Sequence, residues 1–269
     1  ITEKTKAVFA VNLLGNSCEL ADLKRICDNR GLVLIEDNCE SFGASHQNKY
    51  CATWGTAGTF SFFFSHHLQT MEGGMIVTDD QDLYDYMRSL RAHGWVRDIG
   101  DNSSLYTKSG DPFEDSFRFV LPGYCVRPLE MSGAVGQVQL SKANDMLDQR
   151  IVNSKIYHHF FDNVDYARTQ LPTQNSVHSY FGFSFVLENN LYNRRKEVIH
   201  LLKEYDIECR PIVAGNFMRN PVIDRLNYTT YGSYNSANEI HDQGFFLGND
   251  NRNLEEPLTK VKELMETLQ

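Results

Sequence analysis

A strand–helix–strand pattern at the start of the chain constrains the fold more than any other feature. Residues 6–14 form a nearly continuous apolar run that ends at Gly15, as expected for a buried parallel strand. Residues 19–30 carry apolar side chains at helical spacing, and Gly31 ends the helix. A second apolar run, 32–35, follows. The pattern predicts a β-α-β unit with ligand-binding groups at the carboxyl end of its second strand.

That second strand leads directly into two acids, Glu36 and Asp37. A single aspartate at such a place is often a helix cap or a surface acid. Asp37, however, stands at a strand end of a β-α-β unit and 29 residues before His66, which belongs to a motif rich in Ser, Phe and His. This combination favours a ligand-binding role for Asp37.

The remaining patterns predict a larger domain over 1–150 and a smaller α/β domain over 151–269. The segment 98–118 is rich in Asp, Gly and Ser and predicts a long surface loop. The aromatic segment 179–187 predicts a core strand rather than a stacking platform. The other predicted strands are 57–65, 74–78 and 207–213, and the predicted helices are 80–92, 130–161, 191–205 and 255–268.

Composition excludes several classes of protein. The chain is 41% hydrophobic and 23% charged, as is ordinary for a globular protein, and its net charge of −9 opposes binding to nucleic acid. No apolar run is long enough for a membrane span, and the start has no signal-peptide pattern, so a cytoplasmic protein is expected. The cysteines form no Cys-x-x-Cys or Cys-x-Cys pair, which predicts free thiols and no metal site. They are Cys18, Cys27, Cys39, Cys51, Cys125 and Cys209.

Three short motifs resemble those of the DegT/DnrJ-like sugar aminotransferase family. The family hallmarks are E-D-x-x-Q, S-F-x-x-x-K and G-E-G-G, and they correspond here to residues 36–40, 61–66 and 71–74. The resemblance covers essentially the whole chain. His66 takes the position of the lysine that holds pyridoxal phosphate covalently. Within this family, a histidine at that position marks the C3-dehydratases.

The resemblance implies an α/β fold of the fold-type I pyridoxal-phosphate class (aspartate aminotransferase-like). It implies a mixed, mostly parallel sheet, a smaller C-terminal α/β domain, and pyridoxal or pyridoxamine phosphate as the cofactor. By the same match, Asp37 would pair with the pyridine nitrogen and Glu40 would lie beside the phenolic oxygen. Ser61 would hold the phosphate, and Ser65 would orient either the phosphate or His66.

His66 is the implied catalytic base. The resemblance implies loss of the C3 hydroxyl from a GDP-linked 4-keto-6-deoxyhexose, release of ammonia, and glutamate as the amino donor. One imidazole, with an unperturbed pKa near ~6.5, can take a proton and return it to the leaving hydroxyl. A lysine would recapture the cofactor and end in transamination. The alternative for His66 is a core histidine without a chemical role. His67 is expected to face the opposite side of an extended segment and to be structural.

Four further residues are candidates for substrate binding. His93 follows a predicted helix, where a helix-ending role is the alternative. Arg127 ends a loop that, in this family, reaches the partner subunit's cofactor phosphate, so a homodimer is implied. The family usually has Asn where this chain has Cys125. Glu208 and Arg210 are expected either to contact the sugar or nucleotide or to form a surface ion pair.

One family feature is missing at the front of the chain, and three rival functions remain. The N-terminal Gly-Ser-rich turn that cradles the phosphate has no counterpart. The start at Ile1 favours an incomplete chain over a second subunit that supplies this turn or over weakened cofactor binding. A CDP-sugar 3-dehydrase with an iron–sulfur centre is disfavoured because no Cys-x-Cys pair exists. A sugar aminotransferase is disfavoured by the missing lysine, and a non-catalytic sugar-nucleotide-binding remnant remains the alternative from another class.

Overall fold

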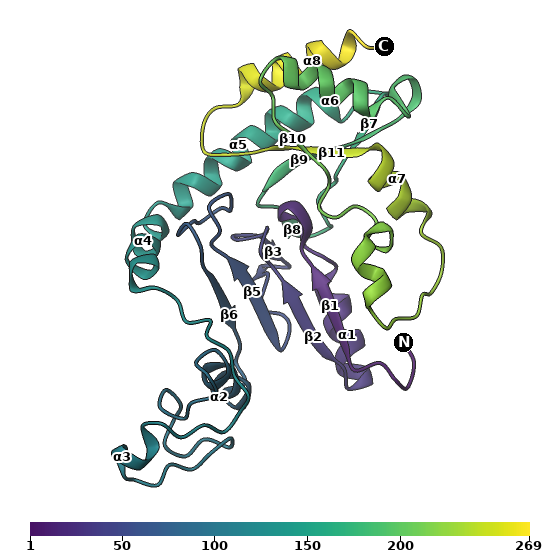
Figure 1. The fold of residues 1–269 in the computed structure, drawn as a ribbon. Coiled ribbons are helices and arrows are strands. Elements are labelled where there is room, and N and C mark those ends of the chain that lie inside the picture. Colours follow the sequence, from purple (N-terminus) through teal and green to yellow (C-terminus); the bar gives the residue numbers. More distant parts are fainter. The chain divides into compact units, whose positions relative to one another are not determined.

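The computed structural model describes residues 1–269, which form two compact units (Figure 1). The first unit comprises residues 1–13 and 17–143, and the second comprises residues 14–16 and 144–269. A short segment from the front of the chain therefore belongs to the second unit. No helix combines the length and the apolar character that crossing a bilayer requires. The assignment of cofactor binding to 1–150 and of a small domain to 151–269 stays a prediction.

The first unit is built on a four-stranded sheet in the order β1-β2-β5-β6. The first three strands are parallel and β6 runs antiparallel to β5, so the sheet is mixed and mostly parallel, as predicted (Figure 1). Helix α1 connects β1 to β2 and ends at Gly31, whose φ of 61° lies in the left-handed region. The predicted β-α-β unit is confirmed. Its elements and the other strands of the sheet are β1 (Ala7–Val11), α1 (Leu20–Arg30), β2 (Val33–Asp37), β5 (Ala57–Ser61) and β6 (Gly74–Val77).

Strand β1 is buried on one face only, in contrast to the prediction of a fully buried strand. Helix α1 packs on one face of the sheet, where Cys27 meets Ala10 and Leu34. On β1, Phe9 and Val11 remain 61% and 46% exposed. The apolar run in the sequence reports the strand correctly, but it does not say which of its faces a helix covers.

Strand β5 ends four residues earlier than predicted. The last residue of the strand is Ser61, and the chain then turns, with the amide of His66 donating to the carbonyl of Phe63 at 2.9 Å. His67 is 3% exposed, which agrees with a structural role. His66 is half-buried, and the two histidines differ in burial because they lie on a turn, not because they alternate along an extended strand.

The predicted helix over 130–161 is in fact two helices, α4 (Glu130–Leu140) and α5 (Ala143–Phe161). The break falls at Ser141, whose hydroxyl donates to the carbonyl of Val138 at 2.8 Å. Such back-bonding by serine competes with the helical ladder. The remaining elements of the first unit are β3 (Ser45–His46), β4 (Lys49–Tyr50), α2 (Gln81–Leu90) and α3 (Pro112–Asp115).

The second unit has an antiparallel sheet in the order β10-β11-β9-β7. The aromatic segment is a core strand, as predicted, because Phe183 and Phe185 are 0% exposed. The sequence did not predict β11, the five-residue partner of β9, because glycines at both of its ends leave a short apolar run. The sheet strands are β7 (Ala167–Thr169), β9 (Gly182–Leu187), β10 (Cys209–Arg210) and β11 (Gly244–Gly248). Strand β8 (Ser176–Val177) is short, and the helices of this unit, besides α5, are α6 (Arg195–Glu204), α7 (Asn235–Gln243) and α8 (Glu255–Glu266). Four 3₁₀ turns also occur in the chain: η1 (Leu13–Gly15), η2 (Asn189–Leu191), η3 (Phe217–Arg219) and η4 (Pro221–Arg225).

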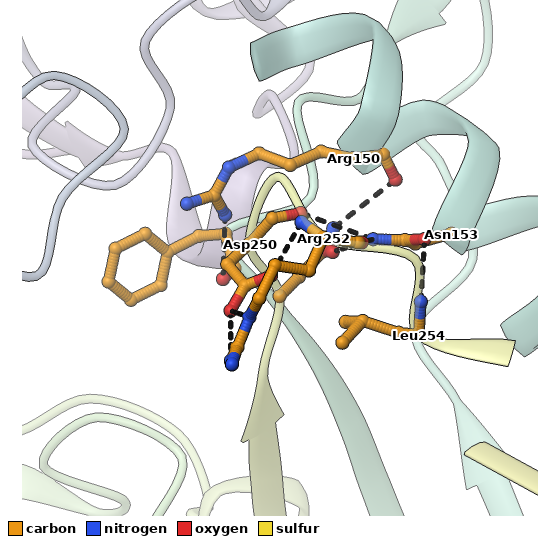
Figure 2. Close-up of polar contacts among 7 residues, drawn as sticks. Arg150, Asn153, Asp250, Arg252 and Leu254 are labelled. Atoms are coloured by element: carbon orange, nitrogen blue, oxygen red, sulfur yellow. Dashed lines mark hydrogen bonds and ion pairs between the residues drawn. The ribbon is translucent and has the colours of Figure 1, made fainter. Parts of the chain in front are cut away.

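A buried polar network fixes the segment between β11 and α8 to helix α5 (Figure 2). Asn153 is 0% exposed, and its side-chain amide donates to the carbonyls of Asp250 at 3.1 Å and Arg252 at 2.8 Å. Its oxygen accepts from the amide of Leu254 at 3.2 Å. Burial lowers the pKa of the nearby Arg150 guanidinium to about 10. One asparagine thus satisfies three backbone groups that would otherwise be buried without partners.

Candidate active site

The predicted cofactor residues lie at one edge of the sheet in the first unit. Asp37 ends β2 and pairs with Thr59 of β5, while Ser61 ends β5 two residues further on. Because β2 and β5 are parallel, their carboxyl ends share an edge, where ligands bind in open α/β sheets. The loops that leave these two ends carry the other three candidates, which are Glu40, Ser65 and His66.

The Asp37 carboxylate is held through one of its two oxygens. Its Oδ1 accepts from the amide of Cys39 at 3.0 Å and lies 3.5 Å from Oγ1 of Thr59. Asp37 is half-buried and forms no ion pair. Burial, and secondly the hydrogen bond to Asp37, raise the pKa of the Cys39 thiol to about 11. The thiol therefore stays neutral beside the Asp37 side chain.

Glu36 has a structural role that the sequence did not reveal. The side chain is 0% exposed, and its carboxylate accepts from three backbone amides. These are the amides of Ala52 at 2.7 Å, Trp54 at 2.6 Å and Gly55 at 2.8 Å. Successive strand residues point to opposite faces, so Glu36 anchors a loop on one side of β2 while Asp37 points to the other.

Two buried asparagines complete this edge, and the sequence did not predict them. The amide of Asn12 donates to the carbonyl of Asp37 at 2.9 Å, and its side chain donates to Oδ1 of Asn38 at 3.3 Å. The Nδ2 atom of Asn38 is buried and has no hydrogen-bond partner. A buried donor without an acceptor costs free energy of folding. An acceptor on a bound ligand would remove this cost, so the unpaired Nδ2 of Asn38 beside Asp37 favours a ligand-binding site here.

The turn after β5 positions His66. Oγ of Ser61 accepts from the amide of Phe63 at 3.3 Å, which leaves the hydroxyl hydrogen of Ser61 to donate elsewhere. The imidazole of His66 packs edge-on against the ring of Phe63, with 6.0 Å between centroids. Both Ser65 and Glu40 are half-buried on turns at the same edge. The imidazole thus has a fixed backbone and a ring contact.

A second group gathers around Trp95. His93 follows α2 with a φ of 64°, and its amide donates to the carbonyl of Tyr124 at 2.8 Å. The rings of His93 and Trp95 lie 5.0 Å apart. The guanidinium of Arg127 lies 5.5 Å from the Trp95 ring, and that of Arg97 lies 4.2 Å from it. The structure therefore brings His93 and Arg127 together on one indole, and it adds Trp95 and Arg97, which the sequence did not predict.

The third group lies in the second unit. Arg210 donates through its Nε and one terminal nitrogen to Oε1 of Glu208, at 2.9 Å and 2.8 Å. Their side chains are 45% and 74% exposed, so the surface ion pair that the sequence allowed is present. Contact of either residue with a ligand stays a prediction.

The donor set at the β2–β5 edge suits an aromatic cofactor that has a basic ring nitrogen and a phosphate. Asp37 offers a carboxylate for a protonated nitrogen, and the hydroxyl of Ser61 and Nδ2 of Asn38 offer donors. No lysine occurs between Lys49 and Lys108, so this edge carries no amine for a covalent attachment. The residues present therefore fit pyridoxal or pyridoxamine phosphate in a non-covalent site.

The fold and the site define an α/β protein of the pyridoxal-phosphate type, with His66 on the turn after β5. More specifically, the chain belongs to the DegT/DnrJ/EryC1/StrS aminotransferase family, whose model matches residues 1–266. It is 45% identical over 263 residues to GDP-4-keto-6-deoxy-D-mannose 3-dehydratase of Yersinia pseudotuberculosis. That match covers 97% of this chain and 66% of the relative.

Two solved structures match this chain with the same TM-score and the same sequence identity. The E. coli GDP-4-keto-6-deoxy-D-mannose-3-dehydratase with bound hydrated PLP matches with a TM-score of 0.93 and 42% identity, over 98% of this chain and 68% of that one. A structure of this enzyme type with a trapped PLP–glutamate geminal diamine matches with the same values. The family and the fold class predicted from the sequence are thereby confirmed. The chain spans about two thirds of the length of these relatives, 66% to 68%.

Proposed function

We propose that this protein is a 3-dehydratase of a GDP-linked 4-keto-6-deoxyhexose that uses pyridoxal and pyridoxamine phosphate. The proposal rests on His66, which takes the family's lysine position by the motif match and lies on the turn after β5. Relatives at 45% and 42% identity bear the name of this activity, which supports the assignment. The fixed carboxylate of Asp37 at the neighbouring strand end also supports it.

Residues of the β2–β5 edge would hold the cofactor without a covalent bond. The Asp37 carboxylate keeps a ring nitrogen protonated, and the Ser61 hydroxyl donates to a phosphate oxygen. Glu40 would contact the cofactor ring, and Ser65 would orient the phosphate or His66. When bound, pyridoxamine phosphate supplies the amine that condenses with the sugar ketone and the ring that withdraws electrons from the reacting carbon.

His66 carries the proton in this proposal. Its imidazole accepts one proton and delivers it to the hydroxyl that leaves C3, so the C3–O bond breaks and water departs. An imidazole, unlike a lysine amine, would form no imine with the cofactor, so His66 would serve only to move the proton that elimination needs. In the balanced reaction, the sugar and glutamate give the 3-deoxy sugar, 2-oxoglutarate and ammonia. Glutamate supplies the two electrons that replace the hydroxyl with hydrogen.

The remaining parts of the proposal concern the substrate, the assembly and the location. His93, Arg127, Glu208 and Arg210 contact the nucleotide sugar. The active form is a homodimer, which is supported by helix α4, a helix without a single buried residue. All six cysteines are free, which supports a reducing cytoplasmic location.

Ammonia release is the decisive measurement. The protein is mixed with pyridoxamine phosphate, glutamate and GDP-4-keto-6-deoxymannose, and we expect ammonia and 2-oxoglutarate in equal amounts. His66→Asn should abolish both while the absorbance of the bound cofactor persists. An amino sugar formed without ammonia would establish an aminotransferase, and tight binding without turnover would establish a sugar-nucleotide-binding protein.

Borohydride provides an independent check of the non-covalent site. The reagent reduces a carbon–nitrogen double bond between the cofactor and a lysine, which would fix the cofactor to the polypeptide. We expect no mass increase of the wild-type chain after treatment and dialysis. A stable adduct on any side chain of the chain would refute the role given to His66.

A further inference from the structure

The second unit contains a groove between α6 and β10 that shares only Arg210 with the residues assigned to the proposed function. It encloses a volume of about 390 Å³. Small-molecule sites commonly occupy about 300–1,000 Å³, so its size suits a compact ligand. Residues of α6 that are spaced by three or four positions form one wall, and the end of β10 forms the other. The basic groove is defined by Arg195, Lys196, His200, Lys203, Cys209 and Arg210.

The lining of the basic groove is strongly positive in a chain of net charge −9. Four of its residues are Lys or Arg and none is acidic. Arg210 is neutralised by Glu208. Neither Lys196 nor Lys203 forms an ion pair, so both charges remain uncompensated at the groove. Such a concentration of one sign is unfavourable by itself and attracts an anion.

Arg195 adds a positive charge that is fixed in place. Its guanidinium donates to the carbonyls of His241 and Gly244, the latter at 2.9 Å. These carbonyls orient the group without cancelling its charge. A guanidinium that is held in advance loses little side-chain entropy when it binds a phosphate oxygen.

Cys209 contributes a thiol to the wall of the groove. Its thiol is half-buried, and burial raises the pKa of Cys209 to about 11. The positive charge of Lys203 opposes this rise. Because Lys203 and Cys209 line the same groove, an anion bound there would also shield the thiol.

We propose that the basic groove binds the diphosphate group of a small anion. Lys196 and Lys203 are seven residues apart, which is roughly 10 Å along a helix. Two linked phosphates span this separation better than one, and Arg195 lies at the end of the same helix face. Helix α6 carries none of the residues assigned to the dehydratase reaction, and Arg210 of β10, which is assigned to it, is paired with Glu208 and is left out of the proposed contacts.

Protection of Cys209 tests the proposal directly. The full chain is titrated with inorganic diphosphate at constant ionic strength, and alkylation of Cys209 near pH ~8 is followed by peptide mass spectrometry. We expect saturable slowing by about fivefold or more, because the occupied groove blocks access to the thiol. Replacing both lysines, as Lys196→Gln with Lys203→Gln, should raise the half-saturating concentration by about tenfold or more.

A matched variant separates the site from the overall charge. Lys4→Gln with Lys155→Gln removes the same number of positive charges at exposed positions outside the groove, and the half-saturating concentration should not change. The alkylation rate of each variant is compared with its own rate without ligand, because the loss of Lys203 changes the pKa of the Cys209 thiol. Equal weakening in the two double variants, or no saturable protection in the wild type, would overturn the proposal.

A second arm distinguishes the two sources of the diphosphate. GDP replaces inorganic diphosphate in the same titration. Protection at a lower GDP concentration would show that the nucleoside is part of the ligand, whereas equal concentrations would show that the phosphates alone are bound. Alkylation requires neither pyridoxamine phosphate nor turnover, so this result and the ammonia measurement can fail separately.

Discussion

At the scale of single residues, the adjacent acids Glu36 and Asp37 illustrate how strand alternation divides two roles. Glu36 is fully buried, and its carboxylate accepts hydrogen bonds from three backbone amides, so its role is structural. Oδ1 of Asp37 accepts from the amide of Cys39, and in the proposed function its carboxylate binds the cofactor. A motif in the sequence shows both acids together, but only the fold shows which of them faces the site.

Replacing Glu36 with Gln should destabilise the protein by about 3 kcal/mol. The amide keeps the size of the side chain, but its NH₂ group would face backbone donors that now face a carboxylate oxygen. Urea unfolding followed by Trp fluorescence measures the change. Glu3→Gln, at an exposed position, should stay within about 0.5 kcal/mol. A cost for Glu36→Gln as small as that of the control would contradict the role given to the carboxylate.

The β-α-β pattern predicted that Asp37 lies at a strand end, because short local patterns define strand ends, whereas Ser61 was expected inside the strand that it in fact ends. Asn12 and Trp95 were not predicted for a common reason. Each acts on residues far away in the sequence, Asn12 on Asn38 and Trp95 on Arg127. A polar or aromatic residue in a single sequence carries no sign of its long-range partner. Such residues become visible only when the topology is known.

At the scale of elements, the boundaries differ from prediction more than the elements themselves. Strand β5 stops at Ser61, and the helix expected over 130–161 is interrupted near Ser141. In both places the apolar periodicity continues past the end of the element. The competing turn hydrogen bonds of His66 and Ser141 decide the boundary, and they leave little trace in the hydrophobic pattern.

The loop after α2 depends on a close backbone approach at Gly94. This residue has a φ of 84°, and a Cβ there would lie 1.8 Å from the carbonyl oxygen of Leu121. Gly94→Ala should therefore cost about 3 kcal/mol or more and displace Trp95. Gly100→Ala, in the same loop but with nothing within 4 Å, should cost little. Urea unfolding and quenching of Trp fluorescence compare the two, and equal stabilities would refute the argument.

At the scale of the whole molecule, the second unit includes a segment from the first twenty residues. Leu14 is 0% exposed, and its carbonyl accepts from the amide of Phe181 at 3.0 Å. The carbonyl of Gly15 accepts from the amide of Ser179 at 2.9 Å. Residues 14–16 thus satisfy backbone groups that immediately precede β9, the strand buried in the core of that unit. A single boundary drawn along the sequence cannot show that residues 14–16 belong to the second unit.

Gly15 is where the contact between residues 14–16 and the segment before β9 should be most sensitive to substitution. Its φ is 96°, and a Cβ would lie 2.5 Å from the amide nitrogen of Tyr180 and 2.8 Å from that of Phe181. Gly15→Ala should therefore push the segment away from the second unit and cost it about 3 kcal/mol. The amides of β9 should then exchange about a hundredfold faster, although the substitution lies far from β9 in the sequence.

Hydrogen exchange of the β9 amides, resolved by NMR, measures this effect. Gly248→Ala is the matched control, because Gly248 lies in the same sheet and a Cβ there has nothing within 4 Å. The control should leave β9 protection almost unchanged. If Gly15→Ala leaves it unchanged as well, residues 14–16 do not stabilise the second unit. If hydrogen exchange of the β9 amides rises while the amides of β2 keep their protection, the two units open separately. Residues 14–16 then stabilise the second unit, although they come from the first twenty residues of the chain.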